Sequence, residues 1–364
     1  LSPFRCHSSA AAGAGLLIER FELAPGYSIS RLVNGGWQLS EGHRPAKLDR
    51  REAIADLRVL VDAGLTTFDC ADIYLGVEEL LGELVRALQR ASDAPEIQIH
   101  TKLVPDRSDL ETIDRQGVIA IVDRSLKRLG VERLDLVQFH WWDYEVPRYL
   151  EVAGWLVDLQ RAGKIRLLGT TNFDTPRLRE LVESGFPVTA HQVQYSVLDR
   201  RPEAAMVEFC RENGIQLLCY GSVAGGFLSA PYAGLPEPEE PLPNRSLTKY
   251  KLIIDEFGGW ELFQELLGRL AKIGRKFQVS PTTVAVRWVL ERPEVAAVLM
   301  GTRSSAHLEQ NLEVFGFGLD EDDRVLLDEI LKVAEGPAGE PFALERYPGG
   351  RHAAIMKTDL NRTA

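Results

Sequence analysis

Short apolar segments alternate with longer segments of helical periodicity along most of the chain. Short apolar runs bounded by polar and turn residues are typical of buried strands. Eight such runs occur: Leu32–Trp37, Thr66–Cys70, Ile97–Lys102, Leu134–His140, Ile165–Thr170, Ala190–Gln194, Ile215–Tyr220 and Val295–Met300. Between them, residues 118–129 and 149–162 place apolar side chains at helical spacing, and Gly163 follows the second as a candidate C-cap.

The order of these segments predicts one α/β domain. Strands that alternate with helices favour a parallel sheet, and eight strand–helix units favour a closed (β/α)8 TIM barrel over an open sheet. A doubly wound sheet carries G-x-G-x-x-G after its first strand, whereas this chain has Asn34-Gly35-Gly36-Trp37 there. We therefore predict a single barrel domain over residues 19–340.

Three further segments flank or interrupt the predicted barrel. Arg20–Leu23 and Tyr27–Ser30 surround an Ala-Pro-Gly turn and are expected to form a hairpin that caps the barrel bottom. Pro231–Pro243 is a Pro-rich loop insertion after the seventh strand. A long loop at the C-terminal face of a barrel usually belongs to the site, and the alternative is a surface insertion without function. Residues 341–364 are expected to be a C-terminal tail.

Composition narrows the classes of partner. The chain has 364 residues, of which 45% are hydrophobic and 26% charged, as in ordinary globular proteins. Its net charge of −11 works against binding to nucleic acid or to an anionic membrane surface. No apolar run approaches the roughly 20 residues needed to span a bilayer. A small-molecule partner is therefore expected, and no pattern predicts the oligomeric state.

The cysteines and the N-terminal segment bear on the compartment. Cys6, Cys70, Cys210 and Cys219 form no C-x-x-C pair and no zinc spacing with the histidines, so we expect reduced thiols in an intracellular protein. Residues 1–18 contain no acidic residue, which fits either a transit-peptide remnant or a disordered tail. A cytoplasmic location is expected, with an organelle interior such as the chloroplast stroma as the alternative.

Four polar residues of different types fall near the C-terminal ends of consecutive predicted strands, where barrel enzymes carry their active sites. Asp69, Lys102 and His140 lie at the ends of the second, third and fourth strands, and Tyr74 lies just past the second. Taken singly, each has a structural explanation, as a cap, a core residue or a packing residue. Lys102 is the hardest to explain in this way, because an ammonium on a buried strand needs a carboxylate beside it.

Together the four side chains fit one acid–base mechanism. A phenol has a pKa of about 10 and is a poor acid at neutral pH. The ammonium of Lys102 would favour the phenolate of Tyr74 and lower its pKa, while Asp69 keeps Lys102 charged and in place. Tyr74 is then the expected proton donor to a carbonyl oxygen. His140 is expected to donate a further hydrogen bond to that oxygen and to orient the substrate.

These segments resemble those of a known enzyme family. Phe68-Asp69-Cys70-Ala71-Asp72-Ile73-Tyr74 is similar to the aldo-keto reductase signature around the catalytic Asp and Tyr. His100-Thr101-Lys102 and Asp135–His140 resemble the family's lysine and histidine strands, and the resemblance extends from about residue 30 to 335. It implies NAD(P)H-dependent reduction of an aldehyde or ketone, or the reverse oxidation, on a fold that binds the dinucleotide without a Rossmann unit.

The resemblance also implies a nicotinamide site across strands five to seven. Thr171-Asn172-Phe173 matches the family's Ser-Asn-Phe motif, with Thr171 in place of the usual Ser. Asn172 and Gln192 would hold the nicotinamide amide, and the ring of Tyr220 would stack on the nicotinamide. Singly, Asn172 fits a turn or cap residue, and Gln192 or Tyr220 a core residue.

The adenosine end of the cofactor is expected after the last strand. Gly301–Asn311 opens a helix whose N–H groups suit a phosphate. By resemblance, Arg303 would contact a 2′-phosphate, and Gln310 and Asn311 the adenine; the structural alternative is an N-capped surface helix. His307 stands where an Arg is common, so NADPH is favoured and NADH remains the alternative.

Three tryptophans near strand ends predict an aromatic substrate pocket. Trp37 follows the first strand, and Trp141 and Trp142 follow the fourth. The loop with Arg245 and Lys249 would add polar contacts, and the carbonyl compound is not specified. Two other functions are alternatives: a cofactor-sensing regulatory subunit of the same fold, and a metal-dependent hydrolase. No metal site is expected, because His140 and His191 at the predicted strands have no converging set of further ligands.

Overall fold

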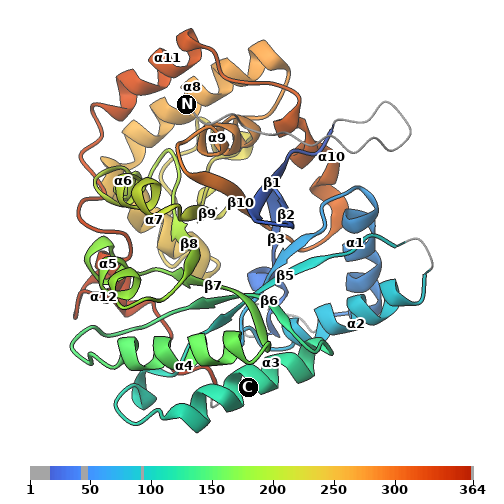
Figure 1. The fold of residues 1–364 in the computed structure, drawn as a ribbon. Coiled ribbons are helices and arrows are strands. Elements are labelled where there is room, and N and C mark those ends of the chain that lie inside the picture. Colours follow the sequence, from blue (N-terminus) through green and yellow to red (C-terminus); the bar gives the residue numbers. More distant parts are fainter. Residues whose placement is uncertain (1–16, 42–47, 92–93, 362–364) are drawn as a thin grey trace.

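The chain folds around a closed barrel of eight parallel strands, in the order β10-β3-β4-β5-β6-β7-β8-β9 (Figure 1). The computed structural model describes residues 17–41, 48–91 and 94–361. The strands are β3 (Leu32–Gly35), β4 (Thr67–Asp69), β5 (Gln98–Leu103), β6 (Leu134–Phe139), β7 (Ile165–Thr171), β8 (Val188–Gln194), β9 (Gln216–Tyr220) and β10 (Val295–Gly301). The predicted (β/α)8 TIM barrel is confirmed. The predictions for Cys6 and for most of the N-terminal segment lie outside the described residues.

Helices cover the outside of the barrel and follow the strands in alternation (Figure 1). They are α1 (Arg50–Asp62), α2 (Val77–Gln89), α3 (Arg115–Leu129), α4 (Tyr149–Arg161), α5 (Thr175–Glu183), α6 (Met206–Asn213), α7 (Arg245–Phe257), α8 (Gly259–Phe277), α9 (Pro281–Leu290), α10 (Leu308–Leu312), α11 (Glu321–Leu331), α12 (Ala343–Arg346) and α13 (Arg351–Ala354). Local sequence sets their ends. For α3, the Asp114 carboxylate accepts from Gly117 N at the start, and Gly130 takes the left-handed conformation at the end, φ 69°.

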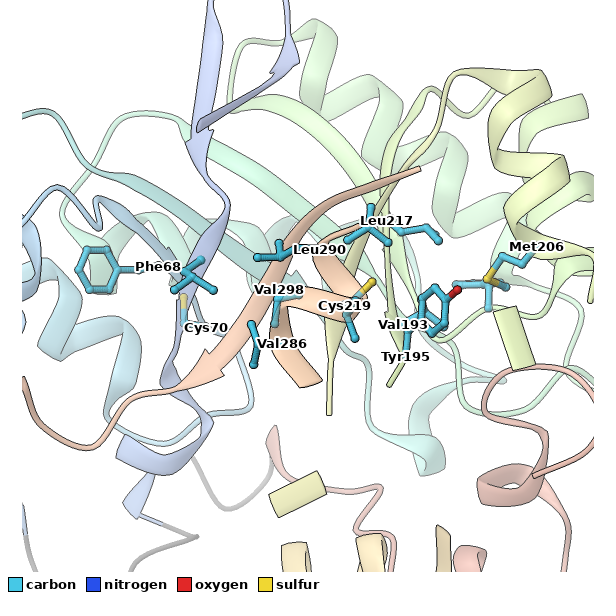
Figure 2. Packing of buried hydrophobic residues seen from close by; sticks show 14 of the residues in the cluster. Phe68, Cys70, Val193, Tyr195, Met206, Leu217, Cys219, Val286, Leu290 and Val298 are labelled. Carbon is cyan, nitrogen blue, oxygen red and sulfur yellow. The ribbon is translucent and has the colours of Figure 1, made fainter. Parts of the chain in front are cut away.

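The main core lies between the strands and the helices. Because successive strand residues face opposite sides, half of each strand points outward to the helices. Figure 2 shows this for Val298 of β10 and Cys219 of β9, which lie near Val286 and Leu290 of α9; all are fully or almost fully buried. The Cys219 thiol is free, and burial raises its pKa well above the ordinary value.

A second, smaller core fills the barrel at the N-terminal ends of the strands. The hairpin β1 (Arg20–Ala24) and β2 (Tyr27–Ser30) closes this end, so the predicted cap is confirmed. Its buried side chains pack in one cluster with inward-facing residues of the strands, namely Leu23, Tyr27, Ile29, Val33, Leu136, Ala190 and Leu218. The guanidinium of Arg166, near the start of β7, lies 4.7 Å from the centroid of the Tyr27 ring. The closed bottom leaves the opposite end for the site.

The Pro-rich loop after β9 does not line the cavity at the barrel mouth. Residues 233–244 form a loop that is held on α7 and α8: Trp260 donates to Leu235 O at 2.9 Å, and Lys251 pairs with Glu237 at 2.5 Å. Among the described residues that line the cavity at the mouth, none comes from 231–243. The expectation that this loop belongs to the site is wrong, because α7, which follows it, takes that position.

The described part of the C-terminal segment is folded over the barrel mouth and is not a loose tail. Two short helices, α12 and α13, are followed by an irregular segment that reaches the loop after β5. The Asp106 Oδ1 atom there accepts from Leu360 N at 2.9 Å and from Asn361 N at 2.8 Å. Phe342 and Leu360 line the cavity. The domain boundary predicted at residue 340 therefore cuts through the site.

Candidate active site

A cavity of about 290 Å³ opens at the C-terminal ends of the strands. Its floor consists of inward-facing strand ends and its walls come from the loops after the strands, from α7 and from the C-terminal segment. The predicted catalytic residues all line it: Asp69, Tyr74, Lys102 and His140. A volume of this size is at the lower end of what small-molecule sites have.

Asp69 and Lys102 form a buried ion pair at the cavity floor. Asp69 is the last residue of β4 and is paired in register with His100 of β5, so Lys102 lies two residues further along the same inward face. Its Nζ lies 2.5 Å from Asp69 Oδ2 and donates to Cys70 O at 2.8 Å. Burial favours the neutral amine, but the Asp69 carboxylate reverses this and raises the pKa of Lys102 above its ordinary value. The lysine therefore stays charged.

The second carboxylate oxygen of Asp69 is held by two amides. Gln138 Nε2 lies 2.9 Å and Gln192 Nε2 2.6 Å from Asp69 Oδ1, and Gln192 also donates to Gln138 Oε1. Gln138 was not among the predicted site residues. Its position two residues before His140, on the same inward face of β6, is the signal that would have identified it. The network fixes the carboxylate against Lys102.

Tyr74 lies beside the lysine at the cavity wall. Lys102 Nζ is 5.1 Å from the centroid of the Tyr74 ring, and the ring packs edge-on against Trp37 at 5.0 Å. Burial raises the pKa of Tyr74 above its ordinary value, and the Lys102 charge only opposes that rise. The pKa decrease expected from the sequence is thus outweighed, because enclosure of the phenol dominates. Tyr74 is held in its protonated form next to a cation.

His140 is buried and neutral. Its Nδ1 lies 3.1 Å from Thr171 O, and because a carbonyl oxygen only accepts, Nδ1 carries the proton. Burial, followed by the charge of Arg346, lowers the pKa of His140 to about 3. The Nε2 atom has no hydrogen-bond partner among the described residues and is an acceptor while the ring is neutral. His140 is therefore arranged to accept a hydrogen bond, whereas the sequence suggested a donor.

The residues predicted for the nicotinamide come together at the ends of β7, β8 and β9. Tyr220 donates to Asn172 Oδ1 at 2.8 Å, and Asn172 N donates to Gln192 O at 3.0 Å. Asn172 has φ 61°, a left-handed conformation that Asn tolerates better than most residues. Thr171, Asn172, Gln192 and Tyr220 all line the cavity. They present an amide and a ring side by side.

Comparison with known proteins identifies the family. The aldo/keto reductase family model matches residues 31–332. This chain belongs to the aldo-keto reductase family. Its members are oxidoreductases that typically reduce small carbonyl compounds with NAD(P)H.

Two relatives and one solved structure illustrate the similarity. An aldo-keto reductase yakc [NADP(+)] of Schizosaccharomyces pombe is 29% identical over 325 residues, 86% of this chain and 89% of the relative. The NADH-specific methylglyoxal reductase of Escherichia coli is 25% identical over 330 residues, 85% and 96% of the two chains. The glycerol dehydrogenase of Gluconobacter oxydans superposes with a TM-score of 0.71 at 24% identity, covering 86% and 95%, and shows the shared fold alone.

In this aldo-keto reductase the residues predicted for the adenosine end lie outside the cavity. Arg303 is exposed and its Nε donates to Gln38 Oε1 at 3.1 Å, while Gln310 Nε2 donates to Ser280 Oγ at 2.8 Å. Asn311 is partly buried on α10. The Asp56 carboxylate accepts from Ser305 N at 3.1 Å, so one N–H of the expected phosphate site already has an anionic partner.

The three tryptophans do not share one role. Trp37 packs on Tyr74, and Trp142 lies edge-on to His140 at 4.3 Å, so both line the cavity. Trp141 is fully buried, packs on Phe139 and donates to Val146 O at 2.9 Å. Its assignment to the substrate pocket is wrong, because adjacent residues leaving a strand point in opposite directions and Trp141 points into the outer core.

The C-terminal segment of this aldo-keto reductase adds residues that the sequence did not suggest. Phe342 lies edge-on to His140 at 5.6 Å, and Ile355, Met356 and Lys357 also line the cavity. Within the described ranges no group of three or more His, Cys, Asp and Glu side chains is arranged to hold a metal ion. Among the helices described, none is both long and apolar enough to cross a membrane.

Proposed function

We propose that this protein catalyses the NAD(P)H-dependent reduction of an aldehyde or ketone to an alcohol, or the reverse oxidation, with Tyr74 as the general acid. The observation that supports this most is the arrangement of Tyr74 beside Lys102, whose charge is maintained by Asp69. A protonated phenol next to a fixed cation is suited to give its proton to a developing alkoxide, because the cation stabilises the phenolate that remains.

Each group in the cavity has a separate role in the proposed reaction. Bound NAD(P)H supplies the hydride. Tyr74 donates the proton to the carbonyl oxygen, and Lys102 stabilises the phenolate. His140 Nε2 accepts a hydrogen bond from a hydroxyl of the substrate or alcohol product. Trp37, Trp142 and Phe342 narrow the cavity and exclude water, which strengthens the electrostatic interactions within it.

The residues present fit a nicotinamide dinucleotide. The amide of Asn172 and the flat ring of Tyr220 face the cavity together, and Gly221 beside them takes φ 78°. A Cβ on Gly221 would come within 2.8 Å of the Tyr250 hydroxyl, so the Tyr250 ring packs directly against the main chain there. The guanidinium of Arg245, 5.5 Å from the Trp37 ring, adds a cation to the rim that suits a pyrophosphate.

For the cofactor we favour NADPH, with NADH as the alternative. Arg303 is exposed and available to a 2′-phosphate, since its Gln38 partner is neutral. The relatives differ on this point, because the Schizosaccharomyces pombe protein is named for NADP(+) and the Escherichia coli protein for NADH.

The first test is a titration with NADPH and, separately, with NADH, followed by quenching of tryptophan fluorescence. Trp37 and Trp142 line the cavity and should report on a nucleotide bound there. Tight binding of one nucleotide would identify the cofactor and justify assays on a panel of carbonyl compounds. Binding without turnover of any of them would favour a cofactor sensor. Failure of both nucleotides to bind would overturn the proposal.

A further inference from the structure

The helix α12 places one arginine between two loops of the active site. The Arg346 guanidinium donates three hydrogen bonds to main-chain oxygens: Nη2 to Trp141 O at 2.7 Å, Nε to Trp142 O at 3.2 Å and Nη1 to Asn172 O at 2.7 Å. In the described part of the chain no carboxylate is within ion-pair distance of this guanidinium. Its Cζ atom lies over two aromatic rings, 4.3 Å from the centroid of Tyr144 and 4.9 Å from that of Phe342.

The three oxygens belong to residues that adjoin His140 or lie in the nicotinamide site. Trp141 and Trp142 directly follow His140, and Asn172 directly follows Thr171, whose carbonyl oxygen accepts from His140 Nδ1. Arg346 therefore ties the loop after β6 to the loop after β7 at the point where both reach the cavity. Within the described part of the C-terminal segment, Arg346 is the donor to all three oxygens.

We propose that Arg346 is a positioning residue of the hydride-transfer site, through which the C-terminal segment holds His140 and Asn172 in register with each other. This inference rests on the proposed reductase function. Arg346 acts through the backbone and through neighbouring residues, and nothing requires it to touch the substrate.

The geometry favours an arginine specifically. A guanidinium presents donors in a fixed plane and can satisfy three acceptors while stacking between aromatic rings, whereas a lysine ammonium is a single point on a flexible stem. Asn172 has φ 61°, a left-handed conformation, and the hydrogen bond from Arg346 to its carbonyl oxygen helps to fix the main chain there. The charge of Arg346 also acts with burial to keep His140 neutral.

The helix itself is anchored by the residue before Arg346. Glu345 is buried, and its carboxylate lies 3.3 Å from Lys249 Nζ and 3.6 Å from Arg201 Nη1. Both partners belong to the barrel and not to the C-terminal segment: Lys249 lies on α7 and Arg201 in the loop after β8. Because α12 has only four residues, these contacts and not helix propensity hold Arg346 in place.

The test compares Arg346→Ala, Arg346→Lys and the matched control Arg351→Ala. Arg351 lies on α13 of the same segment, is exposed, and pairs with Glu240 and Asp255, which do not line the cavity. With the nucleotide and carbonyl compound established for the wild type, we expect Arg346→Ala to lower kcat about 100-fold. Guanidinium ion at a non-denaturing concentration should raise the kcat of Arg346→Ala roughly tenfold. The control Arg351→Ala should have the kcat of the wild type, with and without guanidinium.

Arg346→Lys should lower kcat while leaving KM for the carbonyl compound nearly unchanged, and it decides the matter if Arg346→Ala does not fold. A kcat within about twofold of the wild type in either variant would overturn the inference. The inference would also be overturned if Arg346→Ala had a lower kcat with an unchanged Tm and guanidinium did not raise that kcat. A wild type that neither binds nucleotide nor turns over a carbonyl would instead remove the proposed function, before any variant is compared.

Discussion

The buried ion pair of Lys102 and Asp69 shows how a charge is stabilised at the barrel mouth. Transferring Lys102 and Asp69 out of water carries a large desolvation cost, which their attraction offsets only when the remaining polar atoms are also bonded. Gln138, Gln192 and the Cys70 carbonyl satisfy those atoms. The Asp69 carboxylate raises the pKa of Lys102 despite its burial, so the pair keeps a cation beside Tyr74, which is what a general acid in this position needs.

Replacing Tyr74 by Phe removes the proposed proton donor and leaves the ring in place. We expect kcat/KM for carbonyl reduction to fall by about 10²- to 10⁴-fold, the usual contribution of a positioned acid. The nucleotide dissociation constant should not change, because the hydroxyl is not part of the nicotinamide site. Steady-state kinetics and fluorescence titration on the same preparation give both quantities. A Phe variant of near-normal rate would show that another group donates the proton.

Replacing Lys102 by Met leaves the Asp69 carboxylate buried without its cation. Loss of one partner of a buried pair costs about 3–5 kcal/mol, so the free energy of unfolding should fall by that order. The double variant Lys102→Met/Asp69→Asn removes the uncompensated charge and should recover part of this loss. Denaturant unfolding of the three proteins measures both steps. A single variant as stable as the wild type would mean that the pair does not hold the barrel mouth together.

At this scale the sequence predicts residues of the cavity correctly where a polar residue type stands at a strand end. It was misleading where the direction of a side chain decides its role. Asp69, Lys102 and His140 stand out because polar residues end apolar strands. Strand alternation counted from an inward-facing His140 directs Trp141 away from the cavity and Trp142 towards it, so the error for Trp141 came from not applying that alternation past the end of β6. The neutral, acceptor state of His140 follows from its burial and from the contact of its Nδ1 atom with Thr171 O at the end of β7.

At the scale of elements, the strands were predictable and the C-terminal helices were not. The eight strands have apolar runs of sufficient length, and their observed bounds differ from the predicted ones by a few residues. The helices α12 and α13 have four residues each, too few to show a period. Their position depends on a few individual contacts. The clearest are the hydrogen bonds that Arg346 donates to main-chain carbonyls and the one that Asp106 accepts from Asn361 N.

Replacing Asp106 by Ala should loosen the end of the C-terminal segment. Its carboxylate accepts from Leu360 N and Asn361 N, and Leu360 is a wall of the cavity. Losing these bonds at a cost of about 1.4 kcal/mol would raise KM for the carbonyl compound roughly tenfold. Nucleotide affinity should be unchanged. The control is Asp106→Asn, which keeps an acceptor oxygen and should lie near the wild type; equal KM values for all three proteins would contradict the idea.

At the scale of the whole molecule, closure of the barrel was predictable and cofactor preference was not. Eight strand–helix units leave few alternatives to a closed barrel, and the hairpin cap follows from its turn. The preference between NADPH and NADH depends on surface side chains such as Arg303, whose partner Gln38 lies far away in the sequence. A short segment therefore does not determine it.

The barrel also encloses histidines, and this makes stability depend on pH. Burial lowers the pKa of His100 to about 4 and those of His140 and His191 to about 3. In the unfolded chain a histidine has a pKa of about 6.5. Between these values the unfolded state binds protons that the folded state does not, so the free energy of unfolding falls as the pH falls from about 6.5 towards 4. Each histidine contributes up to about 1.4 kcal/mol per pH unit.

Comparison of the wild type with His191→Asn isolates one of these contributions. The amide can replace Nδ1 beside the Thr170 hydroxyl, which lies 2.8 Å away, without taking up a proton. We expect chemical denaturation midpoints to fall between pH 7 and 5 in both proteins, and less steeply in the variant. Asp72 acts in the opposite direction, because burial raises its pKa, but it is present in both proteins and cancels in the difference. Identical slopes would mean that His191 is protonated in the folded barrel, and that its burial does not keep the ring neutral.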